Sequence, residues 1–350
     1  MADAADQPVL LSGCTTLRLG GPAGAFVEAT TERGLIDAVA AADDAEQPLL
    51  LLAGGSNLVV ADEGFPGTVV HVGTTGMDVD RDACSGATVT VAAGMGWDEL
   101  VAHAIEQEWV GIEALSGIPG SVGATPIQNV GAYGQEVSET IASVRCWDRV
   151  NRTVRTIAAG DCGFGYRSSR FKANPQRFLV LGVTFQFRLG DLGAPVMYAE
   201  LARTLDVAPG DRAPMTEVRR AVLGLRRGKG MVLDDGDHDT WSAGSFFTNP
   251  FLTHEQMDRL PAEAPRWEQP DGTTKTSAAW LIEHAGFTKG YGDDRVSLST
   301  KHTLALTNRG HANTGDLLAL AAQIQHGVRD RFGVWLANEP MLVGCELPRP

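Results

Sequence analysis

Residues 117–134 read GIPGSVGATPIQNVGAYG, and this glycine-dense stretch decides the expected fold. Glycines let backbone N–H groups approach an anion with no Cβ in the way. The spacing of Gly117, Gly120 and Gly123 does not fit the dinucleotide fingerprint G-x-G-x-x-G, and no clear helix follows. A Rossmann fold is therefore disfavoured, and the stretch is interpreted as an irregular backbone cradle.

A second glycine-containing loop, AGGSNL at residues 53–58, directly follows a short apolar strand expected at 49–52. Alone, such a loop is as well explained by a tight turn. Two glycine loops in one region suit the pyrophosphate of a dinucleotide, whose charge backbone amides can meet; two sets of structural turns remain the alternative. A phosphate-loop interpretation of GLRRGK at 224–229 fails, because the run is one residue short and Gly230 follows the lysine.

Composition narrows the class of protein. The 350 residues are 43% hydrophobic, enough for two or three domains, and the net charge of -14 argues against a general nucleic-acid or anionic-membrane binder. Five scattered cysteines without a CxxC pair suggest neither disulfides nor a zinc site, and no metal site is expected. The N-terminus lacks a signal segment and the longest apolar stretch is too short to span a bilayer, so a cytoplasmic protein is expected.

Hydrophobic periodicity predicts helices and strands mixed along the chain without a repeated βαβ unit. Helices are expected at 31–42, 97–107, 278–284 and 313–332, and strands at 49–52, 69–72, 87–93, 143–150 and 178–189. A polar, glycine-containing stretch at 228–239 is a candidate domain junction. The expected fold class is α+β.

Four motifs then occur in one order: GGSNLVV from Gly54, GIPGSVGATPIQNVGAYG from Gly117, GYRSS from Gly165 and SAGSFFTNP from Ser242. In this order they resemble the UDP-N-acetylenolpyruvoylglucosamine reductase (MurB) family over nearly the whole chain. The last motif is the most specific, because a run of that length and composition has little general structural reason to exist.

The resemblance implies a two-lobed FAD-binding module of the vanillyl-alcohol oxidase (PCMH) type and a C-terminal α+β substrate-binding domain. The expected division is lobe 1 at 1–75, possibly joined by 341–350, lobe 2 at 76–230 and the substrate domain at 231–340. FAD would be bound non-covalently, with NADPH as co-substrate. The flavin contacts implied are Gly54, Gly55, Ser56, Asn57, Leu58, Gly117, Ile118, Pro119, Gly120, Ser121, Gly123, Ala124, Asn129, Gly131, Ala132 and Tyr133.

The resemblance also implies a reaction, the reduction of UDP-N-acetylglucosamine enolpyruvate to UDP-N-acetylmuramate in peptidoglycan precursor synthesis. Arg167 resembles the family's catalytic arginine, and its planar guanidinium suits the substrate carboxylate. Ser245 would donate a proton to the carbon next to that carboxylate. Glu339 falls where the family has a catalytic glutamate, although the residues around it depart from the family's pattern. A surface ion pair for Arg167 and a solvated side chain for Glu339 are the ordinary alternatives.

Three further residues are matched to substrate or nicotinamide binding: Tyr198, Lys229 and Asn249. Tyr198 resembles a substrate-covering tyrosine of the family's type I branch, but a plain tyrosine at a helix start explains it too, since the usual following residues are replaced. Trp267 stands near a second substrate-stacking position, and packing accounts for it equally well. A monomer is expected, without nucleic acid or membrane insertion.

Rival functions use the same residues less well. An FAD-dependent alcohol oxidase would employ both glycine loops but leaves SAGSFFTNP, Arg167 and Glu339 without a purpose. A hydrolase built on Ser245 lacks GxSxG and a recognisable triad. A UDP-sugar binding protein without flavin remains the non-enzymatic alternative.

Overall fold

The structure, a computed structural model, describes residues 8–82 and 84–347, and the chain forms two compact units. Unit 1 comprises Met1–Gly24, Gly55–Pro66 and Gly228–Pro350. Unit 2 comprises Ala25–Gly54 and Gly67–Arg227. The polar stretch at 228–239 therefore begins where unit 2 ends, whereas the functional division into 1–75, 76–230 and 231–340 stays a prediction.

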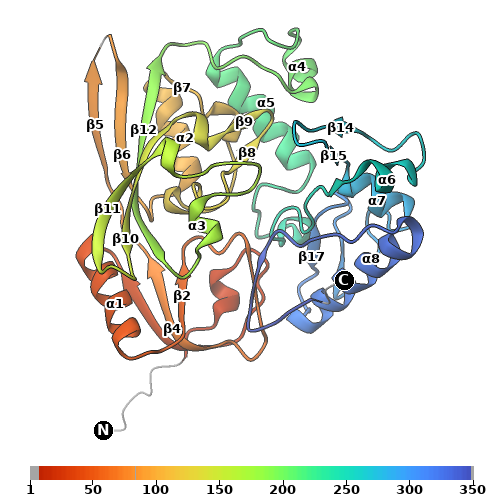
Figure 1. Ribbon diagram of the computed structural model, residues 1–350, viewed down its shortest axis with the longest axis horizontal. Helices are drawn as coiled ribbons and strands as arrows, with labels where there is room; N and C mark the ends of the chain where they lie inside the picture. The colour runs from red at the N-terminus through yellow and green to blue at the C-terminus, as the bar shows by residue number, and fades with distance from the viewer. Residues whose placement is uncertain (1–7, 83, 348–350) are drawn as a thin grey trace. The chain divides into compact units, whose positions relative to one another are not determined.

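Unit 2 is built around two sheets. The smaller has the order β1-β4-β2, in which β2 and β4 are parallel. The larger is antiparallel with the order β11-β10-β12-β6-β5, and β7 pairs with the end of β12 (Figure 1). Its strands and helices are β1 (Ala23–Ala29), α1 (Glu32–Asp44), β2 (Leu49–Leu52), β4 (Phe65–Val72), β5 (Met77–Asp82), β6 (Gly86–Ala92), α2 (Trp97–Glu106), β7 (Trp109–Val110), β8 (Gly131–Ala132), β9 (Gln135–Glu136), β10 (Ile141–Asp148), β11 (Thr153–Ala158), α3 (Arg170–Ala173), β12 (Phe178–Leu189), α4 (Ala199–Leu205) and α5 (Met215–Gly228).

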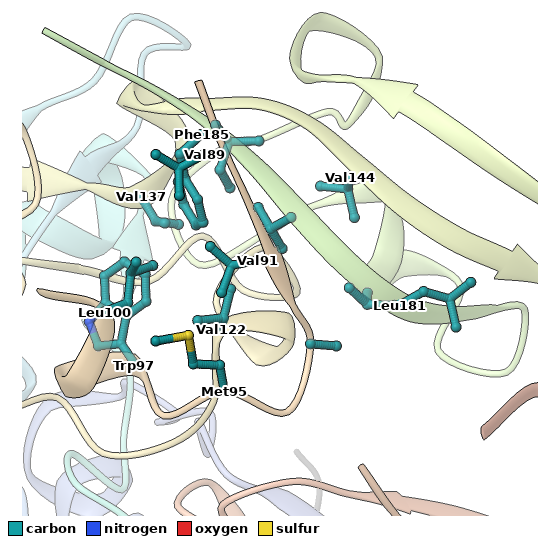
Figure 2. Packing of buried hydrophobic residues seen from close by; sticks show 14 of the residues in the cluster. Val89, Val91, Met95, Trp97, Leu100, Val122, Val137, Val144, Leu181 and Phe185 are labelled. Carbon is teal, nitrogen blue, oxygen red and sulfur yellow. The ribbon is translucent and has the colours of Figure 1, made fainter. Parts of the chain in front are cut away.

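A large part of the core of unit 2 lies between the larger sheet and α2. Val89 and Val91 of β6 face Trp97 of α2, and Val122 of the 117–134 loop packs in the same cluster (Figure 2). All four side chains are buried. The predicted cofactor loop is thus held by an apolar side chain in the core, which limits the freedom of the glycines around it.

In unit 1, α8 packs against α7 and on a small hairpin, β16 with β17. The apolar face predicted for the last helix, including Leu317, Ile324 and Val328, is buried in its core. Its elements are β3 (Leu58–Val60), β13 (Phe251–Leu252), α6 (His254–Asp258), β14 (Trp267–Glu268), β15 (Thr274–Lys275), α7 (Ala278–His284), β16 (Val296–Leu298), β17 (Leu306–Asn308), α8 (Thr314–Phe332) and β18 (Met341–Val343).

Two segments of unit 1 that are far apart in the sequence form a pair of parallel strands. Leu58, Val59 and Val60 of β3 pair with Met341, Leu342 and Val343 of β18. The backbone therefore joins the segment after the first glycine loop to the C-terminal part of the chain.

Local sequence signals explain where several helices begin and end. Thr31 caps α1 by accepting a hydrogen bond from the Gly34 N–H. Asn313 and Asp316 form a capping box at the start of α8, and Gly333, with φ +69°, ends it in the left-handed conformation. Among the described residues, no helix is both long and apolar enough to cross a membrane.

Candidate active site

The two predicted glycine loops touch each other within unit 2. A Cβ placed on Gly54 would lie 2.8 Å from the Gly120 Cα, closer than real side chains allow. Only a residue without a side chain permits this approach. The structure therefore brings together the end of the first loop's strand and the middle of the second loop.

The second loop is fixed along its length by backbone hydrogen bonds. The Val122 N–H donates to the Met95 carbonyl at 2.8 Å, and the Gly123 N–H donates to the Ala93 carbonyl at 2.8 Å. A Cβ on Gly123 would lie 2.5 Å from the Ala93 Cβ. The loop is thus rigidly placed at the end of β6, as a preorganised anion site requires.

Ser121 gives the clearest sign that a polar group belongs against this loop. The residue is only 5% exposed, and its Oγ has no hydrogen-bond partner among the described residues. A buried hydroxyl without a partner costs free energy, so a ligand that supplies one is favoured there. Together with the glycines, which keep Cβ atoms away, this donor set fits the pyrophosphate of FAD.

Gly54→Ala tests whether the contact of the two loops matters for the cofactor. A methyl group there must displace Gly120, so we expect flavin content per protein, read from the absorbance spectrum, to fall several-fold. Gly160→Ala in the same unit is the control, because a Cβ at Gly160 meets nothing within 4 Å. Full flavin content in the Gly54 variant would contradict the assignment of this loop contact to the cofactor site.

The end of the second loop forms a hairpin, β8 with β9, whose turn residues Tyr133 and Gly134 have φ +49° and +86°. A bulky residue with positive φ is uncommon and needs support from its surroundings. The Asn129 side chain supplies part of it: its amide donates to Glu136 at 2.7 Å and to the Gly165 carbonyl at 3.2 Å. The Asn129 side chain therefore holds the loop internally, and its contact with FAD stays a prediction.

Arg167 lies at the tip of a tight turn between Gly165 and Ser168, with φ +50°. Its Nη2 donates to the Gly131 carbonyl at 2.8 Å, and its Nη1 to the Asn129 carbonyl at 3.4 Å. The half-buried guanidinium is therefore attached to the second glycine loop. The structure thus places Arg167 against the second glycine loop, and its role at the substrate carboxylate stays a prediction.

Two charged residues that sequence reasoning missed hold the start of the same loop. The Asp98 carboxylate accepts from the Gly117 N–H at 2.6 Å and from both Nη atoms of Arg219 at 2.7 and 2.9 Å. Burial opposes ionisation of Asp98, but these hydrogen bonds and the nearby arginine charges outweigh it and lower its pKa. No local pattern marks Asp98, because an acidic residue in the first turn of a helix is ordinary.

Arg226 is the third such residue, and the sequence showed it only within a failed phosphate-loop match. Its Nε donates to the Gly117 carbonyl at 3.2 Å, and burial lowers its pKa. Gly117 is therefore held from both its N–H and its carbonyl.

Tyr198 precedes α4 and is 44% exposed. Its ring meets the Tyr133 ring edge-on, with 5.5 Å between centroids. The chain segment that leads to Tyr198 is held by the buried Glu113. The Glu113 carboxylate accepts hydrogen bonds from the Ala194 N–H at 2.6 Å and from Gln135 at 2.8 Å. Unit 2 thus brings the predicted lid tyrosine to the tip of the hairpin that carries Tyr133.

In unit 1, Gly55 is required by packing. Its φ is +58°, and a Cβ there would lie 1.9 Å from the Cys14 carbonyl oxygen. The neighbouring Asn57 donates from Nδ2 to the Glu339 carbonyl at 3.4 Å, and its own carbonyl accepts from the Met341 N–H at 2.9 Å. Asn57 therefore links the first loop to the segment that carries Glu339. The contacts of Gly55, Ser56, Asn57 and Leu58 with FAD stay predictions.

Ser245 and Glu339 come together through a backbone pairing that the sequence does not reveal. The Glu339 N–H donates to the Phe246 carbonyl at 2.9 Å, and Phe247 forms a bridge with Asn338. The Phe246 and Phe247 rings are fully buried, whereas Ser245 and Glu339 are half-buried. SAGSFFTNP thus anchors two aromatic rings and presents the serine next to the glutamate segment.

The remaining substrate candidates lie next to helix ends and on β14. Lys229 directly follows α5, and the Asn249 Oδ1 accepts from the Ala278 N–H at 2.9 Å at the start of α7. Trp267 on β14 is 47% exposed, with the Lys275 Nζ 5.8 Å from its ring centre. Among the described residues, no three His, Cys, Asp or Glu side chains form a group that could hold a metal ion.

Comparison with known proteins identifies the family. Residues 23–157 match the family model of the FAD binding domain, and residues 236–343 match that of the UDP-N-acetylenolpyruvoylglucosamine reductase C-terminal domain. The reductase of this name from Cutibacterium acnes is 57% identical over 344 residues, covering 97% of this chain and 91% of the relative. The chain belongs to the UDP-N-acetylenolpyruvoylglucosamine reductase family.

Other members of the reductase family agree with this. The relative from Streptomyces avermitilis is 56% identical over 348 residues, covering 96% of this chain and 94% of the relative. The crystal structure of the reductase (MurB) from Thermus caldophilus aligns with a TM-score of 0.64 at 25% identity, over 96% of this chain and 98% of that chain.

Membership confirms several predictions made from the sequence. These are the reductase family itself, FAD as cofactor, an FAD-dependent oxidoreductase, and an α+β fold with an FAD-binding module and a C-terminal domain. The roles of single residues and the three-part domain division stay predictions.

Proposed function

We propose that this protein reduces the enolpyruvyl group of UDP-N-acetylglucosamine enolpyruvate with NADPH, giving UDP-N-acetylmuramate for peptidoglycan synthesis. The pairing of the Ser245 and Glu339 segments carries the assignment of catalytic roles, because the two candidate residues stand on adjoining backbone within unit 1. Arg167, in unit 2, is attached to the glycine loop by its guanidinium.

FAD, when bound by the two glycine loops, would supply hydride taken from NADPH to the terminal carbon of the enolpyruvyl double bond. Negative charge then builds on the substrate carboxylate. The Arg167 guanidinium binds that carboxylate through two charge-assisted hydrogen bonds and stabilises the added charge. The Gly131 carbonyl, which accepts from Nη2, sets the direction of the guanidinium plane.

Ser245 completes the addition of two hydrogens. Its hydroxyl donates a proton to the carbon next to the carboxylate, which is basic enough to take a proton from a weak acid. Glu339 acts beside it in the protonated form, since a second negative charge near the developing dianion would oppose the reaction. Lys229 and Asn249 bind phosphates of the UDP-sugar or of the nicotinamide nucleotide, and Tyr198 covers the sugar nucleotide.

The test of the function is direct. Purified, flavin-loaded protein is mixed with NADPH and UDP-N-acetylglucosamine enolpyruvate, and NADPH absorbance and product mass are followed together. We expect NADPH oxidation that depends on the UDP-sugar and a product heavier by two hydrogens. NADPH oxidation at the same rate without the UDP-sugar, or flavin reduced by an alcohol instead, would refute the proposal.

Tyr198→Ala separates a substrate-covering role from simple packing. Loss of the ring removes a contact face for the sugar nucleotide, so we expect KM for the UDP-sugar to rise about tenfold. The rate of flavin reduction by NADPH should stay near normal. Tyr198→Phe is the matched control, because it keeps the ring against Tyr133. An unchanged KM in the alanine variant would leave Tyr198 a packing residue.

The proposal also covers the cellular location and the oligomeric state of the protein. We expect a monomer in the cytoplasm, where NADPH and nucleotide sugars are available to the enzyme. Light scattering coupled to size exclusion measures the mass directly, and a dimer mass at working concentration would contradict the first expectation. The net charge of -14 is consistent with the absence of nucleic-acid binding.

A further inference from the structure

Unit 2 contains a pocket that none of the residues assigned above lines. Its volume is about 330 Å³, and it is lined by Arg155, Arg170, Asn174, Arg177 and Phe178. These residues come from β11, α3 and the turn that leads into β12 (Figure 1). Three of the five lining side chains are therefore guanidinium cations.

The backbone around the pocket fixes the three arginines. Arg155 on β11 pairs with Cys146 on β10 in the sheet register. The Arg170 N–H donates to the Cys162 carbonyl at 2.7 Å at the start of α3. The Arg177 guanidinium lies over the Phe178 ring at 5.1 Å. These contacts therefore hold the three arginines at defined positions in the fold.

A buried carboxylate accounts for two of the three cations. Asp148 is fully buried and accepts from the Nε and Nη2 of Arg177 at 3.2 and 2.9 Å and from Arg155 at 3.4 Å. The Arg177 hydrogen bonds, opposed by burial, hold the Asp148 pKa far below its usual range. Asp148 therefore stays ionised, and Arg155 and Arg177 are the partners that a buried charge requires.

Arg170 is not explained by that ion pair. Its side chain forms no ion pair with any carboxylate of residues 8–82 or 84–347. Three guanidinium charges and one carboxylate leave two positive charges at the pocket. Asp148 and the three arginines all influence the Cys146 thiol. Burial and Asp148 raise the pKa of this thiol to about 11, and all three arginines oppose that shift.

Such an arrangement favours a counter-charge. Like charges held near each other repel, and although water reaches the exposed Arg155 and Arg170, an anion between the guanidinium groups relieves that repulsion. Arginine forks match the geometry of phosphate oxygens and can bind them in pairs. A cavity of this volume holds several water molecules at about 30 Å³ each, which is room for an anion of several heavy atoms.

We propose that the pocket of Arg155, Arg170 and Arg177 binds a compact phosphate-type anion with two or more negative charges. Arg170 contributes a positive charge that no carboxylate of the described residues neutralises. The exposed part of the Arg155 guanidinium contacts the same anion. The Arg177 guanidinium, held by Asp148 and Phe178, forms the fixed wall of the site.

The site adjoins the Arg167 turn through α3. Ser169, the N-cap of α3, donates from Oγ to the Ile127 carbonyl of the second glycine loop. Lys172 donates from Nζ to the Arg167 carbonyl at 3.0 Å. The anion site and the proposed carboxylate site are therefore joined by one short helix, although they share no lining residue.

Calorimetric titration of the flavin-loaded protein with inorganic pyrophosphate at constant ionic strength tests the proposal. We expect saturable binding in the millimolar range or tighter. Arg170→Gln and Arg155→Gln should each weaken it about tenfold, the loss of one charge-assisted contact. Arg188→Gln on β12 is the control, because it removes the same charge from an exposed position in unit 2 and should leave the affinity unchanged.

A second measurement guards against misfolding. Pyrophosphate should raise the melting temperature of the wild-type protein and of Arg188→Gln, and this rise should be clearly smaller at the same concentration in Arg170→Gln, whose side chain pairs with no carboxylate in the described chain. Absence of saturable binding would overturn the proposal. Binding that Arg170→Gln does not weaken, or that Arg188→Gln weakens equally, would overturn it as well. None of these readouts depends on reductase activity.

Discussion

Ser245→Ala should leave the reduction of flavin by NADPH near its normal rate and slow reoxidation by the UDP-sugar by a factor on the order of a hundred or more. The first half-reaction delivers no proton to a substrate carbon, whereas the second needs one. Stopped-flow absorbance follows the two half-reactions separately. The effect should therefore fall almost wholly on one trace.

The surroundings of Ser245 indicate that Ser245→Ala should leave the local backbone unchanged. Phe246 is 1% exposed, and its carbonyl accepts from the Glu339 N–H, so the backbone should keep its path when the hydroxyl is removed. Ser245→Cys restores a proton donor of different size and acidity and should recover part of the rate. Thr248→Val in the same segment is the control for local disturbance. Slow flavin reduction with normal reoxidation in Ser245→Ala would show that Ser245 positions nicotinamide or flavin instead.

Arg167→Lys should lower kcat/KM for the UDP-sugar about a hundredfold, although the positive charge is kept. An ammonium group cannot form two parallel hydrogen bonds to a carboxylate while another donor holds the Gly131 carbonyl. Residue 167 has φ +50°, and lysine and arginine tolerate this conformation about equally, so backbone strain does not explain the loss.

Two measurements separate this loss from trivial causes. Flavin content should stay close to that of the wild type, and Arg188→Lys, at an exposed site in the same unit, should be fully active. A lysine variant at position 167 with near-normal kcat/KM would show that the planar geometry of the guanidinium is unimportant.

The sequence predicted well those elements whose signals are local. Residues 178–189 form β12 and residues 278–284 form α7 with the expected bounds. The alternation of side chains marks the strand, and the helix also follows from its local sequence. The predicted strand at 143–150 is observed at Ile141–Asp148, a shift of two residues where turn residues follow. The two glycine loops were also predicted from local sequence, because glycine itself allows the backbone conformations that such loops need.

The parts that the sequence could not reveal depend on distant contacts. Nothing local in SAGSFFTNP indicates that Phe246 accepts a hydrogen bond from Glu339. Asp98 and Glu113 look like ordinary acidic residues, and only the fold shows that their carboxylates hold Gly117 and Ala194. The contact of Asn129 with the cofactor stays a prediction, and the hydrogen bonds of its side chain to Glu136 and Gly165 are contacts that spacing does not show.

The parallel pair of β3 and β18 has a consequence for synthesis on the ribosome. Leu58, Val59 and Val60 leave the ribosome long before Met341, Leu342 and Val343, with which they pair. Both segments of unit 2 are translated before the strand that completes unit 1, so β3 waits with an unpaired apolar edge while the nascent chain grows. Such edges recruit other chains. We therefore expect β3 to be a point at which the incomplete chain can associate with other chains until β18 has been made.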